Sequence, residues 1–104
     1  MTTQPSYTAE EARALIPQVR STLLQLAIER RRDVADADEA RAGILALLEH
    51  LQSLGIVVRD LEAGLVDIPT TRGGEPAWLC WRLSDPDLAF WHTTSEGFAS
   101  RRPL

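Results

Sequence analysis

The chain has 104 residues, of which 44% are hydrophobic and 25% are charged, and its formal net charge is -4 at pH 7. These values are typical of one globular domain with a single core, and they exclude an intrinsically disordered chain. All 11 basic residues are arginine, which excludes the lysine of Schiff-base chemistry and of a phosphate-binding P-loop.

The N-terminal part of the sequence predicts an amphipathic helix. Thr8 and Glu11 have the spacing of a capping box, so we expect the helix to begin at Ala9. Pro17 lies inside the pattern, where it predicts a kink or a restart of the helix. Apolar residues recur at spacings of three and four and predict a buried stripe, which consists of Leu15, Ile16, Val19, Leu23 and Leu26.

A second helix is predicted before Gly55, which is a typical C-cap residue. Asp36 and Glu39 resemble a second capping pair, and we expect the chain to reverse between residues 33 and 38. Alternatively, the alanine-rich residues 33–42 stay helical and the reversal lies elsewhere. The apolar stripe of this helix comprises Ile44, Leu47, Leu48, Leu51 and Leu54.

After Gly55 the sequence changes to short runs of β-forming residues separated by turn residues. We expect a meander or a pair of hairpins, and therefore an α+β fold in which an N-terminal helix hairpin packs with a small antiparallel β-sheet. We assign residues 1–104 to a single domain with a helical half (8–54), a β half (55–93) and an irregular tail (94–104). The candidate strands are Ile56–Arg59, Leu65–Ile68, Ala77–Leu83 and Leu88–His92.

Three blocks of this sequence carry a resemblance to a known family. They are Tyr7 to Pro17, Gly55 to Pro69, and Leu79-Cys80-Trp81 followed by Trp91-His92 and Gly97-Phe98. The pattern resembles a small bacterial family named domain of unknown function 2203, which has no established activity. The resemblance implies a bacterial cytoplasmic protein and implies nothing about its chemistry.

Two features of the sequence bear on the location of the protein. The N-terminus lacks a basic start followed by an apolar run, and no stretch approaches the roughly 18 apolar residues of a membrane span, so we expect a cytoplasmic protein. Cys80 is the only cysteine. An intrachain disulfide and a four-cysteine zinc site within one chain are therefore excluded.

The sharpest candidate site combines Cys80 and His92 with a carboxylate from Asp67, Asp60 or Glu62. Thiolate, imidazole and carboxylate together suit zinc or a related divalent metal. The paired spacings of most metal sites are missing, however, and the alternative is that Cys80 is a small buried hydrophobe and His92 a strand residue. A nucleophilic Cys80 activated by His92 or His50 is a further alternative.

Strand register decides between these interpretations. A four-residue loop over residues 84–87 would place Cys80 opposite Trp91 and His92 opposite Leu79. In that register, which we expect, the thiol and the imidazole lie on opposite faces of the sheet. A shift of one residue would bring them onto the same face.

Large aromatic side chains are concentrated in the β half, and we propose Trp78, Trp81 and Trp91 as a candidate interface or ligand surface. The alternative is that the rings fill the core. Trp78 and Trp81 differ in parity along the strand, so a regular strand cannot bury both on one face.

We expect a small binding or interaction module that self-associates as a dimer through its helical half, because a second copy would bury more apolar surface. The alternative is a metal-binding or hydrolytic domain that uses Cys80, His92 and a nearby carboxylate, and the sequence leaves open whether the protein is an enzyme. The arginine clusters at 30–32 and 101–102 lie near acidic residues, which argues against nucleic-acid binding.

Overall fold

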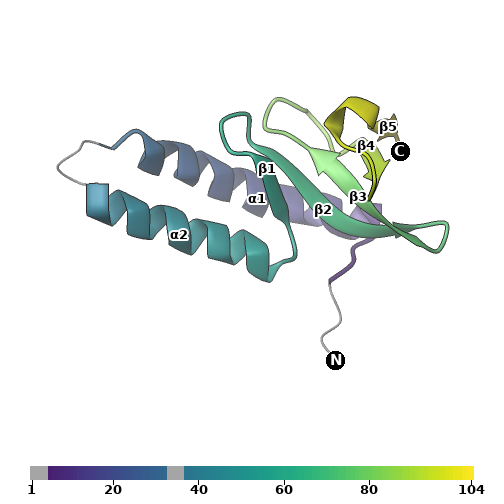
Figure 1. Cartoon of the computed structure of the whole chain (residues 1–104), viewed down its shortest axis with the longest axis horizontal. Helices are drawn as coiled ribbons and strands as arrows, with labels where there is room; N and C mark the ends of the chain where they lie inside the picture. The colour runs from purple at the N-terminus through teal and green to yellow at the C-terminus, as the bar shows by residue number, and fades with distance from the viewer. Residues whose placement is uncertain (1–4, 33–36) are drawn as a thin grey trace.

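The computed structural model describes residues 5–32 and 37–104, which form two helices and a five-stranded antiparallel sheet (Figure 1). The strands lie side by side in the order β1-β2-β3-β4-β5. This architecture confirms the expected α+β class, with a helix hairpin and a small antiparallel sheet. The elements are α1 (Ala9–Arg30), α2 (Ala37–Ser53), β1 (Val57–Asp60), β2 (Leu65–Arg72), β3 (Glu75–Trp81), β4 (Phe90–Thr93), the 3-10 helix η2 (Phe98–Ser100) and β5 (Arg102–Pro103).

Helix α1 begins where the capping box predicts. The Thr8 hydroxyl accepts a hydrogen bond from the Glu11 backbone N–H at 3.1 Å, and the Glu11 carboxylate accepts one from the Thr8 N–H at 2.9 Å. The restart expected at Pro17 does not occur, because α1 continues through it as one helix. Pro17 is exposed, and the stripes before and after it pack into the same core, which offsets the lost backbone bond.

Helix α2 runs antiparallel to α1 and ends at a glycine cap (Figure 1). Gly55 has a φ of 78° and its N–H donates to the Gln52 carbonyl, while the Ile56 N–H donates to the Leu51 carbonyl. These two bonds form a Schellman motif, as the position of Gly55 predicts. The proposed cap Asp36 and the expected start of the reversal lie outside the described residues.

The sheet has two chemically different faces. Val66 and Ile68 of β2 and Leu79 and Trp81 of β3 belong to the hydrophobic core, together with the buried stripe of α1. The alternate residues of these strands therefore project from the opposite face. Asp67 and Cys80 are among them.

The register between β3 and β4 differs from our expectation by one residue. Cys80 pairs with Phe90, and Trp78 pairs with His92, so Cys80 and His92 lie on the same face of the sheet. The connection is longer than the expected four residues, because β3 already ends at Trp81 and β4 begins only at Phe90. It contains a turn in which the Asp85 carboxylate accepts from the Arg82 N–H, and the Asp85 N–H donates to the Arg82 carbonyl.

The C-terminal tail, which we expected to be irregular over residues 94–104, contains two short regular elements. These are η2 and β5, and β5 pairs with β4. Arg101 ties the tail to the loop before β4 through an ion pair of 2.9 Å with Asp85. Apolar and polar residues do not alternate in this short segment. Its strand therefore depends on pairing with β4.

Among the described residues, no helix is both long and apolar enough to cross a membrane.

We predict that Gly64→Ala destabilises the fold more than Gly74→Ala. Both glycines have positive φ, but a Cβ at Gly64 would lie 2.5 Å from Leu83 Cγ, whereas one at Gly74 would meet nothing within 4 Å. The shared backbone strain should cost about 1 kcal/mol, and overpacking should add about 1–3 kcal/mol at Gly64. Urea unfolding measures both losses, and equal losses would contradict the packing described for the turn that leads into β2.

A second prediction concerns Asp85, which is buried. Burial alone would raise the pKa of Asp85, but hydrogen bonds from Arg101 and from the Arg82 N–H outweigh it and hold the pKa below its usual value. The ionised carboxylate therefore stabilises the folded chain above the pKa of the unfolded state, and this contribution is lost as pH falls through the folded pKa.

We expect Asp85→Asn to lower the free energy of unfolding by about 1–3 kcal/mol at pH 7, because it leaves Arg101 without its charged partner. The difference between wild type and variant should shrink as the pH falls below about 4. Thermal unfolding over a pH series measures it. A difference that stays constant into the acid range would show that the charge of Asp85 does not contribute.

Candidate functional site

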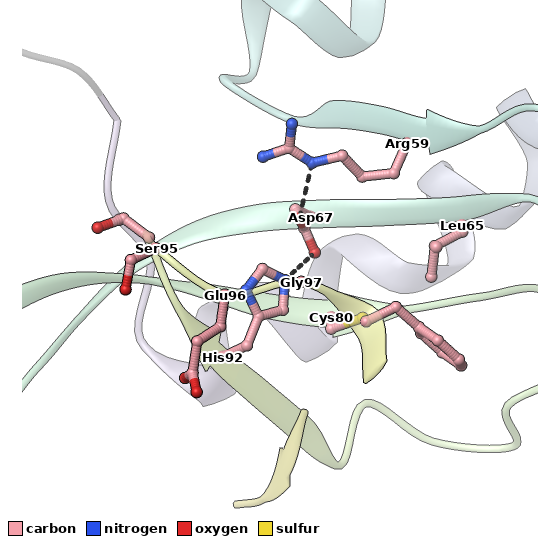
Figure 2. A pocket seen from close by; sticks show the side chains of 10 residues that line it. Arg59, Leu65, Asp67, Cys80, His92, Ser95, Glu96 and Gly97 are labelled. Atoms are coloured by element: carbon pink, nitrogen blue, oxygen red, sulfur yellow. Dashed lines mark hydrogen bonds and ion pairs between the residues drawn. The ribbon is translucent and has the colours of Figure 1, made fainter. Parts of the chain in front are cut away.

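Three potential metal ligands come together on the face of the sheet that points away from the core. Asp67 comes from β2, Cys80 from β3 and His92 from β4, which are adjacent strands. One ligand atom from each lies within 4.8 Å of the others. The three residues are 2%, 1% and 2% exposed, so the cluster is buried. Figure 2 shows these side chains converging.

Asp67 is the centre of the hydrogen bonds in the cluster. Its Oδ1 lies 2.9 Å from His92 Nε2, and its Oδ2 accepts a 2.8 Å bond from Arg59 Nε. Figure 2 shows Arg59 and His92 on opposite sides of the carboxylate. A buried carboxylate is expensive to desolvate, and these two partners compensate its charge.

The His92 ring is oriented from both ends. Its Nδ1 donates to the backbone carbonyl of Thr93 at 2.9 Å, and its Nε2 faces Asp67. Both ring nitrogens therefore face oxygen atoms, and a ring that carries both protons satisfies both contacts. The bond to Thr93 leaves Nε2 as the nitrogen directed into the cluster.

The Cys80 thiol is held in its protonated form. The pKa of Cys80 is raised to about 11, chiefly because burial disfavours the thiolate. The negative charge of Asp67 contributes to the rise, and Arg101 opposes it. Cysteine nucleophiles and metal ligands both act as thiolates. The raised pKa of the free thiol therefore does not support the nucleophilic interpretation at neutral pH, whereas a bound cation would stabilise the thiolate directly.

A cavity of about 330 Å³ opens onto the cluster. One wall is the sheet, with Arg59 and Leu65 beside the three candidate ligands, and the other is the segment from Thr94 to Phe98. The side chains at its rim are shown in Figure 2. The tail thus covers the cluster without closing it, and a small molecule could reach the buried side chains.

The other residues proposed as carboxylate or histidine partners lie elsewhere. Asp60 is exposed and accepts a bond from the Ala63 N–H in the turn after β1. Glu62 is exposed and lines a separate surface hollow beside α1. His50 lies on α2, where its ring bonds with Gln18. Among the described residues, the cluster that could hold a metal comprises Asp67, Cys80 and His92.

The three tryptophans do not form one surface. Trp81 is fully buried in the core, which corrects its assignment to an interface or ligand surface, because its parity places it against the helices. Trp78 projects from the opposite face, where it is half-buried and packs beneath Arg59. Trp91 is half-buried and lies against the guanidinium groups of Arg72 and Arg102.

Sequence reasoning missed two arginines that shape the site. Arg59 contacts Asp67 directly, and Arg101 stacks on the Phe90 ring at 4.0 Å while it influences the Cys80 thiol. Each arginine lies outside the strand of the residue it contacts. The position of Arg59 at the end of a candidate strand was a weak indication that it could contact the site. The sequence of the tail gave no such indication for Arg101.

Comparison with known proteins identifies the chain at the level of its family. Searches of curated proteins and of solved structures each gave no match. Residues 27–104 match the family model described as "Uncharacterized conserved protein (DUF2203)". The matched region includes α2, the whole sheet and all three residues of the buried cluster. Since the match covers well over half of the chain, the protein belongs to the DUF2203 family.

Proposed function

We propose that Asp67, Cys80 and His92 bind one divalent metal ion of the zinc type. The observation that carries this proposal is the convergence of three buried ligand atoms from three strands within 4.8 Å. Zinc lies about 2.0–2.3 Å from its nitrogen, oxygen and sulfur ligands. Ligand atoms within 4.8 Å of one another are close enough for their side chains to approach a common centre.

The charges in the cluster favour this ion. A divalent cation would replace the Nε2 proton of His92 and the thiol proton of Cys80. Two positive charges would leave and two would enter, so the net charge of the cluster would not change. The buried carboxylate of Asp67 would then face a cation in place of a ring N–H. The soft thiolate with nitrogen and oxygen donors suits zinc better than the purely oxygen-seeking magnesium or calcium.

The residues around the cluster resemble the outer supports of known metal sites. A metal-bound histidine usually donates its other ring N–H to a carbonyl or carboxylate, as His92 does to Thr93. Ligating carboxylates are usually hydrogen-bonded as well, as Asp67 is by Arg59. These contacts supply the orientation that an ion requires.

Three protein ligands leave a fourth position, and the cavity lies beside it. Zinc sites with three protein ligands and an open position commonly bind and activate water. Hydrolytic chemistry is therefore the reaction class that this centre would support.

We also propose that the protein acts in the cytoplasm, where the single thiol stays reduced and free to bind metal.

We predict that the purified protein binds one Zn²⁺ or Co²⁺ per chain and that Co²⁺ produces a thiolate charge-transfer absorption. Cys80→Ser should abolish that band. It should also weaken binding by more than the roughly 10–100-fold that follows loss of an outer support. The serine variant keeps the bond between Asp67 and His92, so the fold should persist. Metal titration with absorption and circular dichroism measures both properties.

The matched control is His50→Ala, which removes the other histidine at an exposed site on α2 and should leave metal binding unchanged. Folded wild-type protein that takes up neither ion would contradict the proposed site. Equal binding by wild type and Cys80→Ser would contradict the assignment of the ligands.

We also propose that the protein self-associates through its helical half. Large apolar side chains are exposed on both helices, namely Leu24 and Ile28 on α1 and Leu45 on α2. In Figure 1 the hairpin extends past the sheet, and among the described residues of α2 only Ala40 and Leu51 are buried. A second copy packed on this part of the hairpin would cover apolar surface that the sheet does not reach.

We expect a dimer by light scattering at micromolar concentration. Replacing Ile28 and Leu45 together by glutamate should give a monomer with an unchanged circular dichroism spectrum, because both side chains are more than half exposed in the single chain. Gln25→Glu, which changes an exposed position on α1, should remain dimeric. A wild-type monomer would refute self-association.

A further inference from the structure

We infer that the metal-loaded centre binds a small oxyanion, a carboxylate or a phosphate, with one oxygen at the open metal position and another on Arg59. This inference rests on the proposed metal site and specifies the class of ligand it takes. Three independent features support it: the unused edge of the Arg59 guanidinium, the charge balance of the cluster and the size and lining of the cavity.

Arg59 is held in place while most of its donors remain free. Its Nε donates to Asp67, and its guanidinium lies over the Trp78 ring with 5.2 Å between Cζ and the ring centroid. Among the described residues, neither terminal nitrogen has a hydrogen-bond partner. The side chain is 46% exposed and lines the cavity. A guanidinium held by one edge presents donors suited to carboxylate or phosphate oxygens.

The charge of the loaded site is positive. A divalent ion is balanced by the Cys80 thiolate and the Asp67 carboxylate, so the positive charge of Arg59 remains. Glu96 is the other acidic residue in the cavity wall. Its carboxylate accepts a bond from the Thr93 hydroxyl at 2.9 Å and pairs with Arg102 at 3.2 Å, which compensates its charge. An anion is therefore attracted to the cavity.

The cavity suits a small polar ligand. Its volume of about 330 Å³ is near the lower end of the range of ligand pockets, which begins at about 300 Å³. Thr94 and Ser95 line the cavity. Hydroxyl groups such as theirs can donate hydrogen bonds to further oxygens of the anion. Binding would be a ligand exchange: the oxyanion would take the open coordination position on the metal, the water bound there would leave to solvent, and no covalent bond within the protein or the anion would change.

The test uses the full chain loaded with Co²⁺ and titrated with inorganic phosphate or acetate at constant ionic strength. The visible absorption of cobalt reports a change in its ligands. We expect a saturable change with one anion per chain. Arg59→Gln should weaken the anion at least about tenfold, which corresponds to the loss of one charge-assisted bond. Arg59→Lys, which keeps the charge, should restore part of the affinity.

The matched control is Arg72→Gln, which removes an exposed arginine that lies over the Trp91 ring and is not in the cavity wall. It should bind the anion as wild type does. Tighter binding of phosphate than of acetate would assign a phosphate ligand, and the reverse order a carboxylate ligand.

The outcomes distinguish failure of the anion site from failure of the metal site. Failure of the wild-type protein to bind Co²⁺ would overturn both the metal site and the anion site. Normal Co²⁺ binding without a spectral response to either anion would overturn the anion site alone. The same follows if Arg59→Gln keeps the metal affinity and binds the anion as tightly as wild type.

Discussion

The contact between Asp67 and His92 depends on the register of three adjacent strands, and the arrangement of the site depends on that contact. Asp67 pairs with Cys80 across β2 and β3, and Trp78 pairs with His92 across β3 and β4. These pairings place the carboxylate, the thiol and the imidazole on one face. A slip of one residue at either pairing would turn one ligand toward the helices and replace it with its neighbour in the strand.

The two faces of the sheet explain why so small a chain can maintain a buried polar cluster. The helices cover one face and form the hydrophobic core with it, so that core supplies most of the stabilisation. The opposite face is free to carry polar groups. There the ordered tail between β4 and β5 forms the outer wall of the cavity, and the pair between Arg101 and Asp85 fastens it to the loop before β4.

Local sequence signals predicted the helices well. The capping box at Thr8 and the glycine at Gly55 each act through backbone hydrogen bonds a few residues away, and such signals can be read directly. The helix continues through Pro17 without a restart, because shared core packing outweighs the cost of proline. In the tail, no local signal in the sequence indicated β5, which forms through pairing with β4.

The site was partly predictable. Residue type selected Cys80 and His92 as candidate ligands, with Asp67 as one of three candidate carboxylates beside Asp60 and Glu62, since this combination suits zinc. Their shared face was not predictable, because the register depends on the length of the loop before β4. That loop runs from Trp81 to Phe90 and contains a turn closed by two hydrogen bonds between Asp85 and Arg82. Arg59 was missed because its contact with Asp67 joins β1 to β2 at the point where the register between these strands shifts.

We propose that the thiolate, imidazole and carboxylate of this cluster bind one ion. X-ray absorption spectroscopy of the zinc-loaded protein can test this ligand set, because the measured distances identify the donor atoms. We predict one sulfur at about 2.3 Å and nitrogen and oxygen donors at about 2.0–2.2 Å in a four-coordinate shell. A shell without sulfur, or with six oxygen donors, would show that these three residues do not bind the ion together.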